Sequence, residues 1–132
     1  MPKFSANDVK GNKVTEAALR HQANIVSTWA SWSYQSTVMQ QRIRQLKKRY
    51  GDRLGVVSIC LDSRPQDCRQ RITRDSLKWQ TVCDGKIWDT PLLETFGLAD
   101  VPGNVVIDGK GRIVARNLSV QRLEERINNI LK

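Results

Sequence analysis

Residues 29–36 read Trp-Ala-Ser-Trp-Ser-Tyr-Gln-Ser, and they lie where a predicted strand gives way to a predicted helix. The preceding segment, Asn24–Ala30, is mostly apolar and rich in β-branched residues, which favours a strand. Beyond the serines, apolar side chains follow the spacing of one helix face: Met39, Ile43, Leu46 and Tyr50. Gly51 then stands where the C-terminus of that helix is expected. The two serines therefore belong to a strand–loop–helix junction.

A second strand and a second helix are predicted next. Leu54–Leu61 is a continuous apolar run, which is typical of a strand covered on both faces. Ser63 is expected to cap the helix that follows, with Pro65 in its first turn. Cys68 and Ile72 lie one turn apart on this helix, so both are expected to face the core.

The C-terminal half continues to alternate strands with helices. Its predicted elements are a short strand at Thr81–Cys83, a short helix over Pro91–Phe96 closed by Gly97, a hairpin of Asn104–Asp108 and Arg112–Ala115, and a last helix capped by Ser119 with a stripe of Val120, Leu123, Ile127 and Ile130. Such alternation indicates a mainly parallel sheet, to which the hairpin adds an antiparallel edge. We therefore expect one α/β domain over residues 1–132, with a central mixed sheet and helices on both faces.

Length and composition limit the classes of protein that this chain can be. It has 132 residues, 39% of them apolar, three cysteines and a formal net charge of +9. These values exclude a disordered tail and a disulfide-stapled miniprotein. No apolar run approaches the roughly 20 residues that span a bilayer. The start, Met1–Phe4, has no apolar core of the kind that marks a signal peptide.

Six segments in order carry a resemblance to a known family. They are Phe4–Val14 with Gly11 at its turn, residues 29–36, Leu54–Asp62, residues 88–92, Val101–Pro102 with the strand at 105–108, and the hairpin at 109–113. Together they resemble the thioredoxin superfamily, and within it the extracytoplasmic TlpA/ResA group of the redoxin (AhpC/TSA-like) family. The resemblance spans nearly the whole chain. It implies a thioredoxin fold and a family activity of thiol–disulfide oxidoreduction.

The chain departs from this family at the residues that carry the chemistry. The family has a Trp-Ala-Ser-Trp-Cys-x-x-Cys segment. In this chain Ser33 and Ser36 stand at the positions of its two cysteines. Thiol–disulfide exchange requires a thiolate, whereas a serine hydroxyl is a far weaker acid and forms no reversible disulfide. We therefore expect no catalytic residue at Ser33 or Ser36 and interpret both as helix caps. Nucleophilic serine chemistry would need a base, and the only histidine, His21, precedes the strand.

The resemblance also implies a binding face. The family holds the X–Pro bond at the position of Pro102 in the cis form, opposite the serine motif, where the backbone of the preceding residue pairs with an extended peptide. The alternative for Pro102 is an ordinary turn. Five residues are expected to contact a partner: Trp32, Tyr34, Gln35, Val101 and Pro102. Trp29, by contrast, is interpreted as a core residue.

The three cysteines, Cys60, Cys68 and Cys83, are separated by seven and fourteen residues. That spacing is not a C-x-x-C pattern, and with a single histidine it predicts no zinc site. We expect neither a metal nor a cofactor. Cys60 and Cys83 lie in strands that can run side by side, so the alternatives are a Cys60–Cys83 disulfide or buried thiols, and buried thiols are favoured.

Positive charge is concentrated in residues 42–78, which hold 11 basic and 4 acidic residues, a net +7. Such a balance raises the prospect of nucleic-acid binding. Right-handed crossovers are expected to place the two helices of this segment on opposite faces of the sheet and so to divide the charge. No aromatic residues interleave with the cations as stacking platforms. We therefore expect no nucleic-acid partner and interpret the charges as solvated helix faces.

Two functions follow from the sequence. One is a redox-inactive thioredoxin-like module that binds a protein or peptide at the former active-site face. The other is an active thiol–disulfide oxidoreductase, either one whose own motif cysteines have been exchanged for serine or one that uses Cys60 and Cys83. The resemblance implies an extracytoplasmic location, in the periplasm or cell envelope. A membrane contact is expected only through an N-terminal anchor outside this chain.

Overall fold

The computed structural model describes residues 4–83 and 91–131. Its elements run in the order β1 (Ser5–Asn7), β2 (Lys13–Thr15), a short 3-10 helix η1 (Glu16–Leu19), β3 (Ala23–Trp29), α1 (Tyr34–Tyr50), a 3-10 turn η2 (Gly51–Arg53), β4 (Leu54–Cys60), α2 (Pro65–Asp75), β5 (Gln80–Val82), α3 (Pro91–Phe96), β6 (Asn104–Asp108), β7 (Ile113–Arg116) and α4 (Val120–Leu131). Residues 88–90, which belong to one of the segments that carried the family resemblance, lie outside the described residues.

The central sheet has five strands in the order β5-β4-β3-β6-β7. The pairs β3/β4 and β4/β5 are parallel, and the pairs β3/β6 and β6/β7 are antiparallel. Every residue of β3 and of β4 is buried, because both strands are covered on both faces, as the apolar run in β4 predicts. The expected mixed sheet and thioredoxin fold are confirmed.

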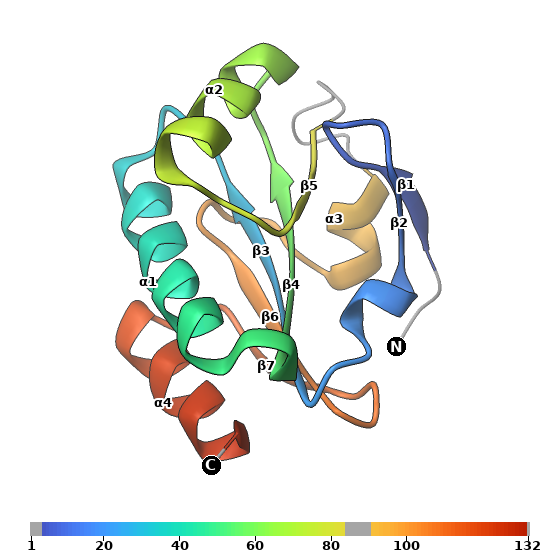
Figure 1. The fold of residues 1–132 in the computed structure, drawn as a ribbon, viewed down its shortest axis with the longest axis vertical. Helices are drawn as coiled ribbons and strands as arrows, with labels where there is room; N and C mark the ends of the chain where they lie inside the picture. The colour runs from blue at the N-terminus through green and yellow to red at the C-terminus, as the bar shows by residue number, and fades with distance from the viewer. Residues whose placement is uncertain (1–3, 84–90, 132) are drawn as a thin grey trace.

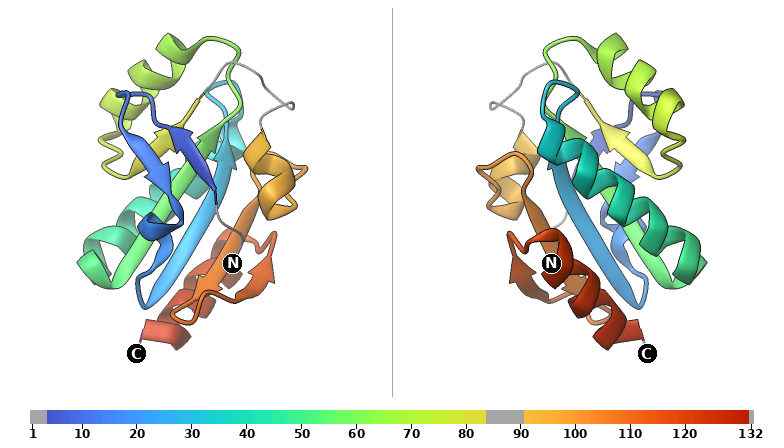
Figure 2. Two further views of the ribbon diagram at one scale, coloured as in Figure 1. Left: turned by 90° about the vertical axis from the view of Figure 1, so that its right-hand side faces the viewer. Right: turned by 90° about the vertical axis from the view of Figure 1, so that its left-hand side faces the viewer.

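Helices cover both faces of the sheet, as expected (Figures 1 and 2). One face carries α1, α2 and α4, whose side chains share a single core cluster that includes Met39, Ile72 and Ile127. The other face carries α3, η1 and the β1–β2 hairpin, with Phe96 and Leu19 in a second cluster. The hairpin turns at Gly11, whose positive φ of 85° suits glycine. None of the described helices is long and apolar enough to cross a membrane.

The expectation that α1 and α2 lie on opposite faces is wrong. The chain passes from β3 to β4 and then to β5 in one direction across the sheet. Two right-handed crossovers that progress in the same direction place their helices on the same face. The basic residues of α1 and α2 are therefore on one side of the sheet, and the division of charge that argued against nucleic-acid binding does not occur.

A second correction concerns the start of α2. Ser63 was expected to cap this helix, but the N-cap is Arg64, which makes no side-chain capping hydrogen bond. Pro65 occupies the first helical position, where its fixed φ and missing N–H suit the helix, so the residue before it becomes the cap. The expected cap of α4 is present, since the Oγ of Ser119 accepts a hydrogen bond from the N–H of Arg122 at 3.3 Å.

Candidate functional site

Ser33 caps α1, and Ser36 does not. The Ser33 backbone is extended, and its Oγ accepts a hydrogen bond from the N–H of Ser36 at 3.3 Å. Its carbonyl accepts a second bond from the N–H of Thr37, also at 3.3 Å. Ser36 lies in the first turn and is buried, and its Oγ has no hydrogen-bond partner among the described residues. The cap interpretation is therefore correct for Ser33 and wrong for Ser36, because only one residue can occupy the N-cap of a helix.

The loop before Ser33 is held at both backbone atoms of Ser31. The N–H of Ser31 donates to the Oδ1 of Asp62 at 2.8 Å, and its carbonyl accepts from the guanidinium of Arg71 at 3.2 Å. Arg71 also donates to the Oγ1 of Thr37 on α1 at 2.8 Å. The end of β4 and the helix α2 therefore fix the position of the serine motif.

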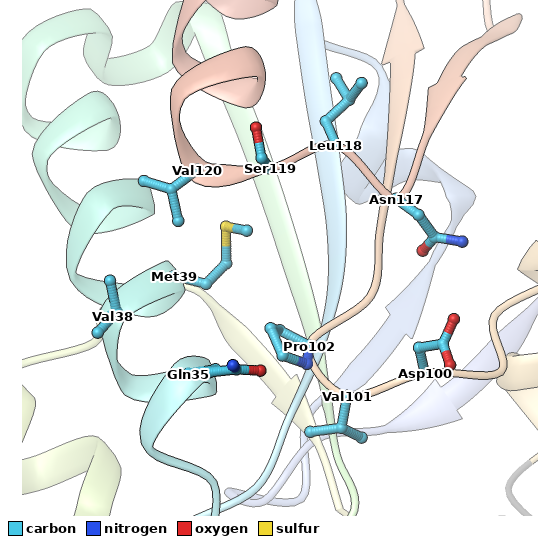
Figure 3. Close-up of a pocket in the computed structure, with 10 residues that line it drawn as sticks. All are labelled: Gln35, Val38, Met39, Asp100, Val101, Pro102, Asn117, Leu118, Ser119 and Val120. Carbon is cyan, nitrogen blue, oxygen red and sulfur yellow. The ribbon is translucent and has the colours of Figure 1, made fainter.

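The predicted binding residues divide into two groups. Gln35, Val101 and Pro102 come together and line one groove (Figure 3). Trp32 and Tyr34 are 64% and 81% exposed on the neighbouring loop and first helical turn, and neither is among the residues that line the groove. Trp29 is buried, as expected of a core residue.

The groove has a volume of about 580 Å³. Gln35, Val38 and Met39 form its wall on α1, residues 100–102 form its end, and residues 117–120 form the opposite wall (Figure 3). Sequence reasoning missed the wall at residues 117–120, apart from the capping role of Ser119. The local sequence has no motif there, because the wall exists only where the β7–α4 connection meets α1.

Thr28 at the end of β3 anchors the loop that carries Pro102. Its Oγ1 donates to the carbonyl of Asp100 at 2.6 Å and accepts from the N–H of Gly103 at 2.6 Å. The Val101–Pro102 peptide bond is cis. Within the described residues, the N–H and carbonyl of Val101 make no hydrogen bond. The loop thus presents a backbone donor and acceptor beside the groove.

The three cysteines form a second group of reactive side chains, at the same end of the sheet as the serine motif. Their Sγ atoms all lie within 4.8 Å of one another, and each residue is a buried thiol rather than half of a disulfide. The preference for thiols over a Cys60–Cys83 disulfide agrees with this arrangement. That Cys68 joins the other two was not predicted, because spacing along the chain does not show which face of α2 meets which strand.

Neighbouring thiols and burial control the ionisation of this cluster. Hydrogen bonds with Cys68 and Cys83, followed by burial, raise the pKa of Cys60 far above its ordinary value. For Cys68, the hydrogen bond with Cys60 favours the thiolate, but the hydrogen bond with Cys83 and burial outweigh it and raise the pKa. Cys60 and Cys68 are therefore protonated thiols at neutral pH, which are poor nucleophiles.

Basic side chains of α1 and of the α2–β5 connection line a separate hollow of about 400 Å³. It is bordered by Arg44, Lys47, Lys48 and Lys78, together with Ser76 and Trp79. Trp79 is buried, and its indole N–H donates to Ser58, so its ring is not an exposed stacking platform. The cations gather around one hollow, and the buried ring of Trp79 adds no exposed stacking surface to it.

Comparison with known proteins gives consistent matches along the chain. The model of the AhpC/TSA family matches residues 1–116. The thiol-disulfide oxidoreductase ResA of Bacillus thuringiensis is 22% identical over 126 residues, which cover 94% of this chain and 70% of that protein. A thiol-disulfide oxidoreductase from Bacteroides fragilis is 24% identical with a TM-score of 0.86 over 98% of both chains. A C-terminal domain from Bacteroides thetaiotaomicron, described as that of a thiol-disulfide oxidoreductase, is 29% identical with a TM-score of 0.83 over 98% of this chain and 92% of that one.

Proposed function

Because this chain belongs to the AhpC/TSA family, as a thioredoxin-like domain of the TlpA/ResA type, we propose that it binds an extended polypeptide in the groove beside Pro102 and carries out no thiol–disulfide exchange at Ser33 and Ser36. The observation that carries this proposal is the groove itself. It adjoins the serine motif, and Val101 presents its backbone N–H and carbonyl along one side.

The chemistry of the motif supports the redox-inactive part of the proposal. The family resemblance places cysteines where Ser33 and Ser36 stand, and the Oγ of Ser33 is engaged as the cap of α1. A hydroxyl at this place keeps the helix N-terminus and its partial positive charge but supplies no thiolate. The site thus retains the electrostatics of its family without the atom that exchanges disulfides.

The lining of the groove supports a polypeptide as its occupant. Aliphatic side chains, among them Val38 and Leu118, alternate with polar ones such as Gln35 and Asn117. An extended peptide gains affinity from hydrogen bonds to exposed backbone groups and specificity from pockets for alternate side chains. Here the backbone of Val101 offers the hydrogen bonds, and the aliphatic walls of the groove offer a pocket for side chains. Trp32, exposed on the adjacent loop, extends the apolar surface that such a peptide would meet.

A second candidate is an active oxidoreductase that uses Cys60 and Cys83. The observation that favours it is the closeness of the three sulfurs. Burial and the raised pKa of Cys60 count against it, because a buried protonated thiol neither reaches a partner disulfide nor attacks one readily. We therefore rank this candidate second. The location that we propose for either function, outside the cytoplasm, is supported by the resemblance to the TlpA/ResA group.

Two exposed valines provide a matched test of peptide binding. Val38 is 41% exposed and lines the groove, whereas Val114 is 36% exposed on β7 and does not line it. A peptide selected on this domain from a random display library should bind Val38→Asp at least tenfold more weakly, a loss of about 1.4 kcal/mol. Its affinity for Val114→Asp should match that for the parent chain. Equal losses in both variants, or amide shifts on binding that avoid Val101 and residues 117–120, would overturn the proposal.

A further inference from the structure

The fold brings three thiols from three different elements to one point. Cys60 is the last residue of β4, and Cys83 directly follows β5. These strands are parallel neighbours with Ile59 paired to Val82, so the next residue of each lies beside the other on the same face of the sheet. Cys68 reaches the pair from α2, which covers that face. We propose that Cys60, Cys68 and Cys83 form a three-coordinate thiolate site for a soft metal ion, and that this ion is Cu(I).

The spacing of the sulfurs suits a single metal ion. All three Sγ atoms lie within 4.8 Å of one another. Thiolates bound to one ion at about 2.3 Å lie about 4.0 Å apart in a trigonal plane. The distances between the sulfurs would therefore have to shorten by less than about 1 Å, which small side-chain rotations can achieve. A disulfide would use only two of the sulfurs, whereas a metal ion accounts for the convergence of all three.

The identity of the donors selects the kind of ion. Thiolate sulfur favours soft ions such as Cu(I), whereas structural zinc sites almost always take four ligands. The only histidine, His21, lies before β3, and its Nδ1 forms a hydrogen bond with the carbonyl of Asp52 at 2.7 Å. Among the described residues the ligand set is therefore sulfur alone, with three donors. That number and type fit three-coordinate Cu(I).

Asp62 places a buried carboxylate near the cluster. Asp62 is 2% exposed, and its Oδ2 has no hydrogen-bond partner among the described residues. Cys83 donates a hydrogen bond from its thiol to the Asp62 carbonyl at 3.7 Å, and the Asp62 charge helps to raise the pKa of Cys68. A negative charge without a full set of partners is costly inside a protein. Three thiolates with one Cu(I) carry a net charge of −2, so this carboxylate would raise, not lower, the electrostatic cost of binding.

Binding at this site would release protons. Only thiolates are good ligands, so each thiol that coordinates the ion must lose its proton to solvent. The affinity for metal should consequently rise with pH.

Hydrogen bonds also join the surroundings of the site to the serine loop, because Asp62 accepts from the N–H of Ser31 and Arg71 donates to its carbonyl.

The test is an anaerobic titration of the reduced chain with Cu(I), in competition with a chromophoric Cu(I) chelator. We expect one ion per chain, protons released into a weakly buffered solution, and three sulfur neighbours at about 2.3 Å by X-ray absorption. The variants Cys60→Ala, Cys68→Ala and Cys83→Ala should each bind at least tenfold more weakly. Ser33→Ala should bind as the parent does, because its hydroxyl is not a ligand. Circular dichroism of each variant separates loss of a ligand from loss of the fold.

Several outcomes would overturn the inference. One is Cu(I) affinity that is unchanged in all three cysteine variants. Another is stoichiometric binding of Zn(II) with no competitive binding of Cu(I), which would refute the assignment of the ion. A third is a chain that, purified without reductant, holds a disulfide among these cysteines and takes up no metal after reduction. None of these results depends on peptide binding at the groove, and loss of peptide binding would leave the metal site standing.

Discussion

The Oδ1 of Asp62 accepts a hydrogen bond of 2.8 Å from the backbone N–H of Ser31. This bond joins the end of β4 to the loop that presents the serine motif, across a separation of 31 residues in sequence. Asp62 is buried and follows Cys60 by two residues, and its backbone carbonyl accepts a hydrogen bond from the thiol of Cys83 at 3.7 Å. Asp62 therefore links the loop, through its carboxylate, to the thiol cluster, through its backbone.

Replacing this carboxylate should separate its role as an acceptor from its charge. Asp62→Ala leaves the Ser31 N–H without its acceptor and should lower the free energy of unfolding by about 1–3 kcal/mol. Asp62→Asn keeps an oxygen at the same place and should lose less. Urea unfolding measures both, with Asp52→Ala at an exposed site as the control, which should stay within about 0.5 kcal/mol of the parent. Equal losses for Ala and Asn would show that the hydrogen bond is not the important feature.

Ser58 is expected to be one of the least replaceable polar residues of the core. Its Oγ accepts from the indole N–H of Trp29 at 3.1 Å and from that of Trp79 at 3.0 Å, and both rings are buried. Ser58→Ala would leave two buried donors unpaired and should cost about 2–5 kcal/mol. Ser119→Ala, which removes an exposed helix cap, should cost about 1 kcal/mol. A similar small loss for both, measured by urea unfolding followed by tryptophan fluorescence, would refute the role of Ser58.

The thiol cluster should make stability sensitive to alkaline pH. Hydrogen bonds with Cys68 and Cys83, and then burial, raise the pKa of Cys60 above the ordinary value of 9.0. Because the folded pKa is the higher one, its contribution is complete below about pH 9 and is lost as the unfolded chain releases its protons above that value. The free energy of unfolding of the metal-free chain should fall more steeply above about pH 9 than that of Cys60→Ala/Cys68→Ala/Cys83→Ala. Parallel pH profiles for the two proteins would contradict this.

The β6–β7 turn should lose stability at acid pH, whereas the thiol cluster loses it at alkaline pH. Hydrogen bonds from the backbone N–H groups of Arg112 and Lys110, with the guanidinium of Arg112, hold the pKa of Asp108 below its ordinary 3.8. A lowered folded pKa contributes stability above the unfolded value, and that contribution is lost as the pH falls through the folded pKa. Asp108→Asn should therefore lose less stability than the parent when the pH drops below about 4. Carbon-detected NMR titration of the Asp108 carboxyl gives its pKa directly, and an unshifted value would refute the turn assignment.

The helices and strands were largely predictable because their patterns are local. The apolar run of β4 and the stripe of α1 lie within a residue or two of the observed elements, and Ser33 and Ser119 cap their helices. Three features were not predictable from local patterns. The shared face of α1 and α2 depends on strand order, the meeting of Cys68 with the other cysteines depends on the rotation of α2, and the groove wall at residues 117–120 depends on a long-range contact.

The site residues also divide into those that the sequence predicted and those that only the structure shows. Gln35, Val101 and Pro102 were found because the family resemblance places them, and they meet in one groove. The expected absence of a nucleic-acid partner stays a prediction, and it has lost its support from the division of charge, because α1 and α2 share one face of the sheet. The three cysteines were judged one at a time from their spacing, and only the structure shows that they form a group.

The central claim, that Ser33 and Ser36 leave the domain without disulfide exchange, is tested most directly by reduction of insulin disulfides. The assay compares the parent chain, the Ser33→Cys/Ser36→Cys variant, and the variant in which Cys60, Cys68 and Cys83 are alanine. We predict activity only in the Ser33→Cys/Ser36→Cys variant, because the fold and the helix N-terminus are in place and only the thiols are missing. Activity in the parent chain that disappears when the three cysteines are replaced would contradict the account.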